Sequence, residues 1–279
     1  MIKIKATIGG YGNTMTHLYE QDYPLKLGDK TFLDHHILMC GDARTDLEDF
    51  IKDENVKLIL SDPPFGVNRM KGNTKMIDEL RPISINEETM KDSYNSDDFP
   101  VFEGDEDFTP EPLVKTGLPM ILFGGNYYHD LLPRGTRWFV WYKKPNLTLS
   151  PQATWSDCEL IYTTFSGIKC ELLHHTWFGM IRKGERRLES AKRVHPTQKP
   201  VGLLIDLIER FTKEGDTILD PYAGGGSTLI ACAETGRRCL SMEIMPEYCE
   251  RIIQRYYKYR EQTLNKFGKV NTNLVSCEA

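Results

Sequence analysis

Strand-length apolar runs alternate with segments of helical spacing through most of this chain. The run VKLILSD at 56–62 is continuous, as expected of a strand buried on both faces of a sheet. The same pattern predicts further strands at 35–42, 119–125, 137–143, 158–165, 216–222 and 237–244. Strands that alternate with helices indicate an α/β fold, which we expect to be doubly wound around a mostly parallel seven-stranded sheet.

Helices are predicted between several of these strands. Apolar residues recur at helical spacing from Pro200 to Phe211, with proline at the first turn and Gly215 just past the end. The other predicted helices are at 46–53, 126–132 and 227–235, with a last one that begins at Pro246.

The domain boundaries follow from where this alternation stops. We expect a domain at 35–266, after an N-terminal extension at 1–34 and before a C-terminal tail at 267–279. Within the domain, 66–112 is a polar segment without a clear period, and 166–194 is ambiguous. A loop as long as the first is uncommon in a compact domain unless it is functional or disordered.

The sequence predicts neither a membrane segment nor a secretion signal. The first residues contain no long apolar run, and no stretch approaches the ~18 apolar residues that span a bilayer. The seven cysteines form no CxxC pair, which favours free thiols in a reducing compartment over disulfides or zinc. His174 and His175 would point to opposite faces of a strand, so no metal site is expected. We therefore expect a soluble intracellular protein.

The net charge of −5 hides a strong asymmetry along the chain. Residues 78–111 carry a local charge of −10, so the remaining residues carry +5. Residues 182–199 alone hold seven bases against two acids. A basic stripe beside an acidic loop is compatible with contact to a phosphate backbone, and a solvated surface segment explains it equally well.

A glycine-rich turn, DPYAGGGST at 220–228, joins a predicted strand to a helix. Glycines there let the backbone turn sharply and approach a ligand closely. Glu243 ends the next strand, 19 residues beyond Gly224, and its carboxylate could accept hydrogen bonds from ribose hydroxyls. A dinucleotide site would need a third small residue where Leu229 stands. The turn thus favours a nucleoside ligand without a pyrophosphate over a purely structural turn.

The turn Asp62-Pro63-Pro64-Phe65 follows directly on a buried strand. Two prolines stiffen the backbone and remove two N–H donors, which leaves the Asp62 carboxylate and the Pro63 carbonyl as acceptors. With the ring of Phe65 beside them, they would suit a planar group that bears an NH2. A rigid turn that ends a strand, with a solvated aspartate, is the alternative.

Three motifs in this order resemble those of the amino-DNA methyltransferases. DPPF at 62–65 matches the family's [DNS]-P-P-[YFW] motif, and DPYAGGGST at 220–228 resembles its DPFxGSGTT motif. HPTQKP at 195–200 matches a third motif letter for letter. Along the chain, the catalytic DPPF motif comes first, HPTQKP second and the glycine-rich motif last. This order resembles the β group of the family. The stretch KLGDKTFLDHHILMCGDART at 26–45 resembles members of the phage and prophage type.

The resemblance implies a Rossmann-like fold that binds S-adenosylmethionine, and it assigns roles by motif. The target base would be held by Asp62, Pro63, Pro64 and Phe65. The methionine side of the cofactor would be lined by Asp220, Ala223, Gly224 and Gly226, with its carboxylate near His195, Thr197 and Lys199. Glu243 would bind the ribose, and Asp42 would lie near the adenine. The chain departs from the commonest family wording at Tyr222, Gly225 and Ser227.

The implied activity is site-specific methylation of DNA, as in restriction-modification, on a base flipped out of the duplex. Aspartate in the first position of the four-residue DPPF motif is typical of adenine-N6 enzymes, and serine there is typical of cytosine-N4 enzymes. Methylation of cytosine N4 and a non-catalytic cofactor-binding or DNA-binding protein are the alternatives. The resemblance is compatible with a homodimer, and it implies the cytoplasm of a bacterial or phage-infected cell, beside the nucleoid.

Recognition of the DNA would fall to the two segments outside the motifs, 66–112 and 166–194. Both are short for the family, which predicts a short or relaxed recognition sequence, or recognition completed by a second subunit. Candidate contacts to the DNA backbone are the basic residues Lys143, Lys144, Arg182, Lys183, Arg186, Arg187, Lys192 and Arg193.

Overall fold

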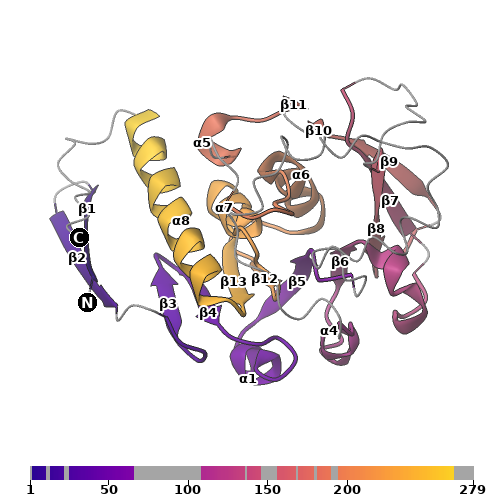
Figure 1. Ribbon diagram of the computed structural model, residues 1–279, viewed down its shortest axis with the longest axis horizontal. Coiled ribbons are helices and arrows are strands. Elements are labelled where there is room, and N and C mark those ends of the chain that lie inside the picture. Colours follow the sequence, from indigo (N-terminus) through magenta and orange to yellow (C-terminus); the bar gives the residue numbers. More distant parts are fainter. Residues whose placement is uncertain are drawn as a thin grey trace, which may run out of the picture.

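A nine-stranded mixed sheet forms the centre of the molecule, in the order β3-β4-β13-β12-β5-β6-β8-β7-β9 (Figure 1). The computed structural model describes residues 2–10, 13–21, 25–65, 108–135, 137–145, 156–167, 169–178, 181–189 and 194–266. The strands of this sheet are β3 (Lys30–Leu33), β4 (His36–Cys40), β5 (Val56–Ser61), β6 (Met120–Phe123), β7 (Arg137–Tyr142), β8 (Cys158–Thr163), β9 (Cys170–His174), β12 (Thr217–Asp220) and β13 (Arg238–Glu243).

Neighbouring strands are parallel from β4 through β13, β12 and β5 to β6, and β8 is antiparallel to both of its neighbours. The predicted α/β class with a mostly parallel sheet is therefore confirmed. The sheet has nine strands rather than the predicted seven, because the apolar runs in the sequence did not predict β3 and β9. Both are short edge strands with only one well-covered face, so neither shows the continuous apolar run of the central strands.

Helices cover both faces of this sheet. They are α1 (Leu47–Ile51), α4 (Glu111–Lys115), α5 (Arg186–Glu189), α6 (Val201–Phe211), α7 (Ser227–Glu234) and α8 (Pro246–Lys266). In place of the helix predicted at 126–132 there are two single turns of 3-10 helix, η2 (Gly125–Tyr127) and η3 (His129–Leu131). Tyr128, with φ of −137°, leaves the helical region between the two turns and so interrupts a continuous helix.

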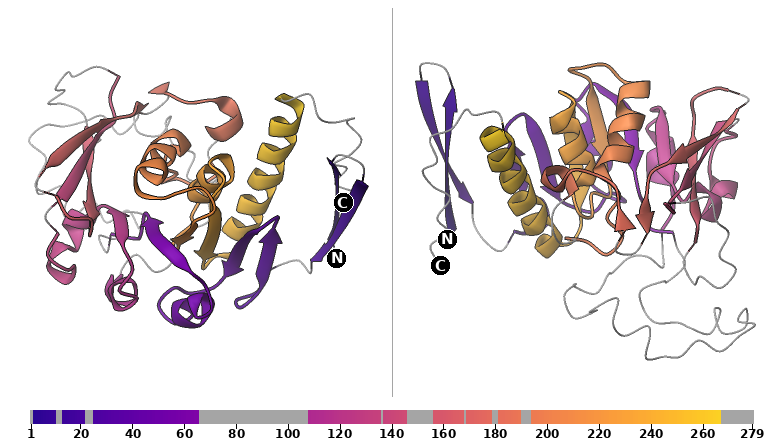
Figure 2. Two further views of the ribbon diagram at one scale, coloured as in Figure 1. Left: turned by 180° about the vertical axis from the view of Figure 1, so that it is seen from behind. Right: turned by 90° about the horizontal axis from the view of Figure 1, so that it is seen from above.

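Alternate residues of the central strands feed two separate cores. Leu58 and Leu60 of β5 pack with α6, α7 and α8, whereas Ile59 packs with α1 and α4. Figures 1 and 2 show the same arrangement, with α6, α7 and α8 on one side of the sheet and α1 and α4 on the other. This two-sided covering explains why the central strands read as unbroken apolar runs.

The strands β5 and β12 lie side by side, yet the chain leaves them in opposite directions. After β12 it continues through α7 to β13, and before β6 it passes through α4 on the opposite face. Such a divergence between adjacent parallel strands opens a crevice at their carboxyl ends, where open α/β sheets bind ligands. The turn after β5 is the Asp-Pro-Pro-Phe turn, and the turn after β12 is the glycine-rich turn.

Three features fall outside the predicted pattern. In the predicted extension at 1–34, β1 (Ile2–Gly10) and β2 (Asn13–Gln21) form a separate antiparallel hairpin. The main sheet already begins at β3, ahead of the predicted domain start at residue 35. β10 (Trp177–Phe178) and β11 (Ile181–Arg182) form a second small hairpin. Among the described helices, none has the length and apolarity needed to cross a membrane.

Candidate active site

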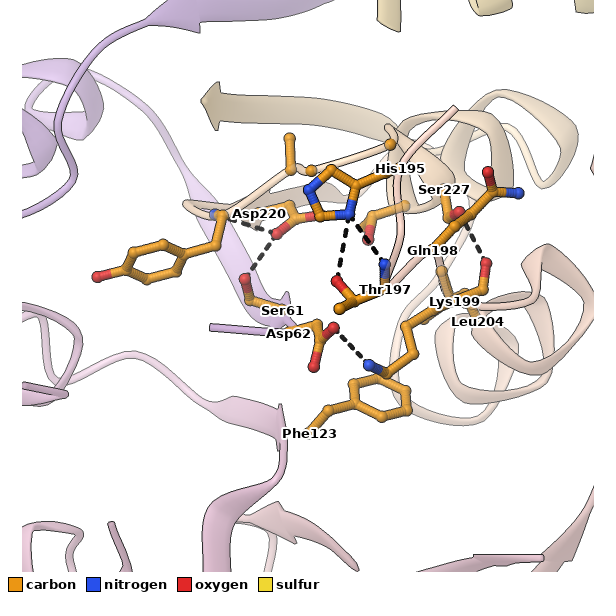
Figure 3. A pocket seen from close by; sticks show the side chains of 15 residues that line it. Ser61, Asp62, Phe123, His195, Thr197, Gln198, Lys199, Leu204, Asp220 and Ser227 are labelled. Atoms are coloured by element: carbon orange, nitrogen blue, oxygen red, sulfur yellow. Dashed lines mark hydrogen bonds and ion pairs between the residues drawn. The ribbon is translucent and has the colours of Figure 1, made fainter. Parts of the chain in front are cut away.

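A cavity opens where the two predicted turns meet, at the carboxyl ends of β5 and β12 (Figure 3). The HPTQKP segment closes it from a third side, because 195–199 runs between the two turns before α6 begins. The residues that line the cavity are Ser61, Asp62, Phe123, His195, Thr197, Gln198, Lys199, Leu204, Asp220, Tyr222, Ala223, Gly224, Gly225, Ser227 and Thr228. The three sequence motifs, which are far apart in the chain, therefore converge on one site.

The Asp62 carboxylate lines this cavity. Its Oδ2 forms an ion pair with the Lys199 ammonium, whereas its Oδ1 has no hydrogen-bond partner among the described residues. Burial raises the Asp62 pKa to about 6, although the Lys199 charge opposes this shift. Nearby Glu159 contributes to the same rise. At neutral pH the group is thus a carboxylate with one oxygen held by Lys199 and the other buried without a hydrogen-bond partner among the described residues.

Lys199 is nearly buried and lies between two carboxylates. Besides Asp62, its Nζ is 3.5 Å from Oε2 of Glu159 on β8. Burial opposes the charge of the ammonium, but the two carboxylates outweigh it and raise the Lys199 pKa. The sequence motif places Lys199 near the methionine carboxylate of a cofactor, whereas the structure places its ammonium on Asp62.

Phe65 lies beside the cavity against the turn that follows β6. Its ring stacks on Tyr127 with centroids 4.7 Å apart and an interplanar angle of 18°. A side chain at Gly124 would put its Cβ 2.1 Å from this ring, so only glycine allows the close approach. Pro63 is buried and Pro64 half-buried, which fixes the turn between Asp62 and Phe65.

Other parts of the chain pack closely against the glycine-rich turn. Gly224 and Gly226 have φ of 52° and 71°, a region that glycine alone adopts without strain. A Cβ at Gly226 would come within 2.8 Å of Ile252 on α8, and one at Gly224 within 3.2 Å of the His195 ring. Burial lowers the His195 pKa to about 3, so this ring is neutral where it packs on the turn.

Glu243 lies at the end of β13, behind the glycine-rich turn. Its two carboxylate oxygens accept hydrogen bonds from the backbone N–H groups of Gly224 at 2.9 Å and Met245 at 3.0 Å. Burial raises its pKa to about 7. Asp42 lies at the neighbouring strand end, where the Arg44 guanidinium holds its carboxylate at 2.7 Å and lowers its pKa. Neither carboxylate lines the cavity itself, and nor does Gly226.

Arg255 of α8 is a site residue that the sequence did not predict. Its guanidinium is buried and donates to the carbonyl of Gly225 at 2.6 Å, to Oγ of Ser227 at 3.1 Å and to the carbonyl of Leu188 at 3.1 Å. It thereby ties α5, in the segment proposed to recognise DNA, to the glycine-rich turn. A charged residue on the apolar side of α8 is the only signal the sequence offers.

Several predicted DNA contacts are already paired within the domain. The Lys143 ammonium lies 3.0 Å from Glu159, and the Lys144 ammonium lies 2.5 Å from Asp157. The Arg187 guanidinium lies 2.6 Å from Glu234 on α7. By contrast, Lys183 is exposed. The side chains of Arg182 and Arg186, and the whole of Lys192 and Arg193, lie outside the described residues.

Most of 66–112, the first segment proposed to recognise DNA, also lies outside the described residues, which resume at Phe108. Within the described ranges, no group of three or more histidine, cysteine, aspartate or glutamate side chains could hold a metal ion.

Comparison with protein families matches residues 140–255 to a model described as DNA methylase. The putative methylase YubD of Escherichia coli (strain K12) is 48% identical over 59 residues, which are 21% of this chain and 26% of that protein. The type II methyltransferase M2.DpnII of Streptococcus pneumoniae is 42% identical over 72 residues, 26% of either chain. The chain thus matches about a quarter of the length of these curated relatives.

Two solved structures align with most of this chain. The PvuII DNA methyltransferase (cytosine-N4-specific) aligns with a TM-score of 0.50 and 16% identity over 85% of this chain and 97% of that chain. The M1.HpyAVI–SAM complex aligns with a TM-score of 0.45 and 19% identity, over 78% and 97% of the two chains. The first likeness supports the predicted Rossmann-like fold. The family match and the curated relatives confirm the resemblance to amino-DNA methyltransferases, while the phage subgroup stays a prediction.

Proposed function

We propose that this chain, as an amino-DNA methyltransferase, transfers a methyl group from S-adenosylmethionine to the N6 amino group of adenine in DNA. The observation that carries the proposal is the position of Asp62. Asp62, whose Oδ1 has no hydrogen-bond partner in the part of the chain that the structure describes, lines the same cavity as the glycine-rich turn. A base amino group on Asp62 would therefore lie next to a cofactor seated on that turn.

The residues present fit S-adenosylmethionine. Gly224 and Gly225 line the cavity without side chains, so a ligand can approach the backbone of the turn closely. His195, Thr197, Asp220, Ala223 and Gly224 line the cavity and would hold the methionine part. Glu243 would accept hydrogen bonds from the ribose with the lone pairs that Gly224 and Met245 leave, and Asp42 would lie toward the adenine. When bound, the cofactor supplies a methyl group on a sulfonium, a good leaving group.

The chain's own residues would activate the amino nitrogen. Its lone pair is delocalised into the ring of the base, so it is a weak nucleophile. Oδ1 of Asp62 and the Pro63 carbonyl would accept hydrogen bonds from its two N–H groups and direct the lone pair at the methyl carbon. The nitrogen lone pair would form the new N–C bond. The electron pair of the broken C–S bond would remain on sulfur. Asp62 would accept the proton that the nitrogen releases.

The base must leave the duplex to reach this site, at a cost of a few kcal/mol in lost stacking. Phe65, beside Asp62, would offer a face to the flipped ring. Aspartate at the first position of the DPPF motif favours adenine over cytosine. Contacts to the DNA backbone would come from the exposed part of the basic segment, of which Lys183 is the described member. A short recognition sequence and a homodimer stay predictions.

The direct test is to identify the modified base. The purified chain is incubated with methyl-labelled S-adenosylmethionine and mixed-sequence double-stranded DNA, which is then digested to nucleosides and separated. We expect the label in N6-methyldeoxyadenosine, and an Asp62→Ala variant as the control should give none. Label in N4-methyldeoxycytidine would overturn the choice of base. Cofactor binding without any transfer would overturn the proposed activity.

A further inference from the structure

Four charges of alternating sign form a chain that leads away from the target-base turn. The carboxylate of Asp62 holds the ammonium of Lys199, which contacts the carboxylate of Glu159, which in turn contacts the ammonium of Lys143. Each group comes from a different part of the sheet or from the HPTQKP segment. At most 23% of any of these side chains is exposed, so water screens the charges poorly.

We infer that Lys199 is a positioning residue for Asp62, and that Glu159 holds Lys199 in the orientation this requires. The inference rests on the proposed function and deepens it. It assigns to the HPTQKP lysine a task in methyl transfer rather than in binding the methionine carboxylate. It also assigns a role to Glu159 and Lys143, neither of which belongs to a sequence motif.

The geometry supports a positioning role because it divides the two oxygens of Asp62. Lys199 holds Oδ2, and Oδ1 is left without a hydrogen-bond partner among the described residues. A carboxylate on a turn can rotate about its own side-chain bonds, and a fixed ammonium on one oxygen removes that freedom. The free oxygen then points in one direction, as an acceptor for an amino group must.

Lys199 is itself held from several sides. Glu159 on β8 contacts its ammonium, and the Phe123 ring lies 5.2 Å from Nζ at the end of β6. The Phe65 ring lies 6.0 Å away. A lysine side chain is flexible in water, so this enclosure is needed if the ammonium is to place Asp62 accurately.

The charge balance argues against the methionine carboxylate as the main partner of Lys199. Two ammonium groups face two carboxylates in this network, so it needs no further anion to be neutral. A third carboxylate at Lys199 would compete with Asp62 and Glu159 for one cation. The cofactor carboxylate would then be held by other groups that line the cavity, such as Thr197.

The network makes a prediction that mere structural damage would not imitate. The groups that face Asp62 are Lys199 ahead of α6, Glu159 on β8, Asp220 on β12 and Tyr128 between η2 and η3. Lys199 favours the ionised form of Asp62, and Glu159 disfavours it. Removal of the Lys199 charge should therefore raise the pKa of Asp62, and separate removal of the Glu159 charge should lower it.

The experiment compares Lys199→Gln, Glu159→Gln and the conservative Lys199→Arg with the unmodified chain. Single-turnover methyl transfer is measured against pH, and the Kd for S-adenosylmethionine is measured by calorimetry. We expect the transfer rate of the unmodified chain to fall on the acid side of its pH profile, near pH 6. This acid limb should move to higher pH in Lys199→Gln and to lower pH in Glu159→Gln. Lys199→Gln should also slow transfer by about 10²-fold, Lys199→Arg should recover part of the rate, and the cofactor Kd should stay within about threefold.

The inference is overturned if the two limbs move in the same direction or not at all. It is also overturned if Lys199→Gln weakens cofactor binding by tenfold or more with an unmoved limb, because Lys199 would then bind the cofactor. A ¹³C NMR titration of the Asp62 carboxyl group, assigned with Asp62→Asn, keeps the test independent of activity. If the unmodified chain transfers no methyl group, the proposed function fails, and the titrations still decide whether Lys199 and Glu159 act on Asp62.

Discussion

Ser61 donates a 2.6 Å hydrogen bond from its hydroxyl to the carboxylate of Asp220, and both side chains are buried. Ser61 is the last residue of β5 and Asp220 the last residue of β12, so the bond joins the two strand ends. The next residue after Ser61 is Asp62, and Asp220 opens the glycine-rich turn. One hydrogen bond thus fixes the proposed base-binding turn relative to the proposed cofactor turn.

Replacement of Ser61 by alanine should loosen this connection. The substitution leaves the buried Asp220 carboxylate without one of its donors, which costs about 1–3 kcal/mol of unfolding free energy. Methyl transfer should also slow, because the proposed base-binding turn and the proposed cofactor turn are no longer held together. Urea denaturation and single-turnover transfer measure the two effects.

Ser241→Ala provides a matched control for Ser61→Ala. Ser241 is also buried, and it pairs with Asp220 in the sheet register, but its hydroxyl contacts Sγ of Cys239 at 3.2 Å. We expect this variant to transfer methyl groups at the normal rate. Equal losses of transfer in both variants would show that Ser61 has no special role.

The position of the site could be predicted from sequence because strand ends and turn motifs are local features. Asp62 follows a continuous apolar run, and the glycine-rich turn follows another, so both fall at the same edge of a parallel sheet. The partners of these residues could not be predicted in this way. Glu159 and Arg255 reach the site from β8 and α8, and only the packing of those elements brings them there.

Glu243 should make the protein less stable as the pH rises. Its carboxyl has a pKa of about 7 in the folded chain, above the ordinary 4.5, so the folded state binds its proton more tightly than the unfolded state. The stabilisation is complete below about pH 4.5 and is lost as the pH rises to about 7. One such group gives a slope of at most about 1.4 kcal/mol per pH unit.

The slope is measured by urea denaturation at several pH values between 5 and 7, in the unmodified chain and in Glu243→Gln. The unfolding free energy of the variant should fall less steeply with pH. Asp62, whose pKa is raised in the same direction, contributes to both proteins and cancels in the difference. Glu209→Gln, on the exposed side of α6, serves as the control. Parallel slopes in the Glu243→Gln variant and the unmodified chain would contradict the assignment.

We expect the basic segment to divide into residues that contact DNA and residues that support the fold. Lys183→Gln should weaken DNA binding and reduce its salt dependence by about 0.9 in the log–log slope, which corresponds to one phosphate contact. Arg187→Gln should instead lower the unfolding free energy, because its guanidinium joins Glu234 and Thr263 across α5, α7 and α8. Filter binding against salt and urea denaturation separate the two. A salt slope that changes only in Arg187→Gln would reverse this assignment.

This division shows a second limit of sequence reasoning. A run of lysines and arginines looks alike along the chain, whether each charge faces solvent or a carboxylate of a distant helix. Lys143 and Lys144 stand next to each other, and both pair with acidic residues around β8 that no local pattern connects with them. Lys199 shows the same limit within a motif, because the motif identifies the residue but not its partner.

Asp62 is proposed to hold the amino group that receives the methyl. The most direct measurement is single-turnover methyl transfer by Asp62→Asn, set beside its affinity for S-adenosylmethionine. Asparagine keeps the shape of the side chain but exchanges one acceptor oxygen for an NH2 donor. We predict an unchanged cofactor Kd and a transfer rate lowered by at least about 10²-fold. A variant that transfers methyl groups at the normal rate would contradict the account.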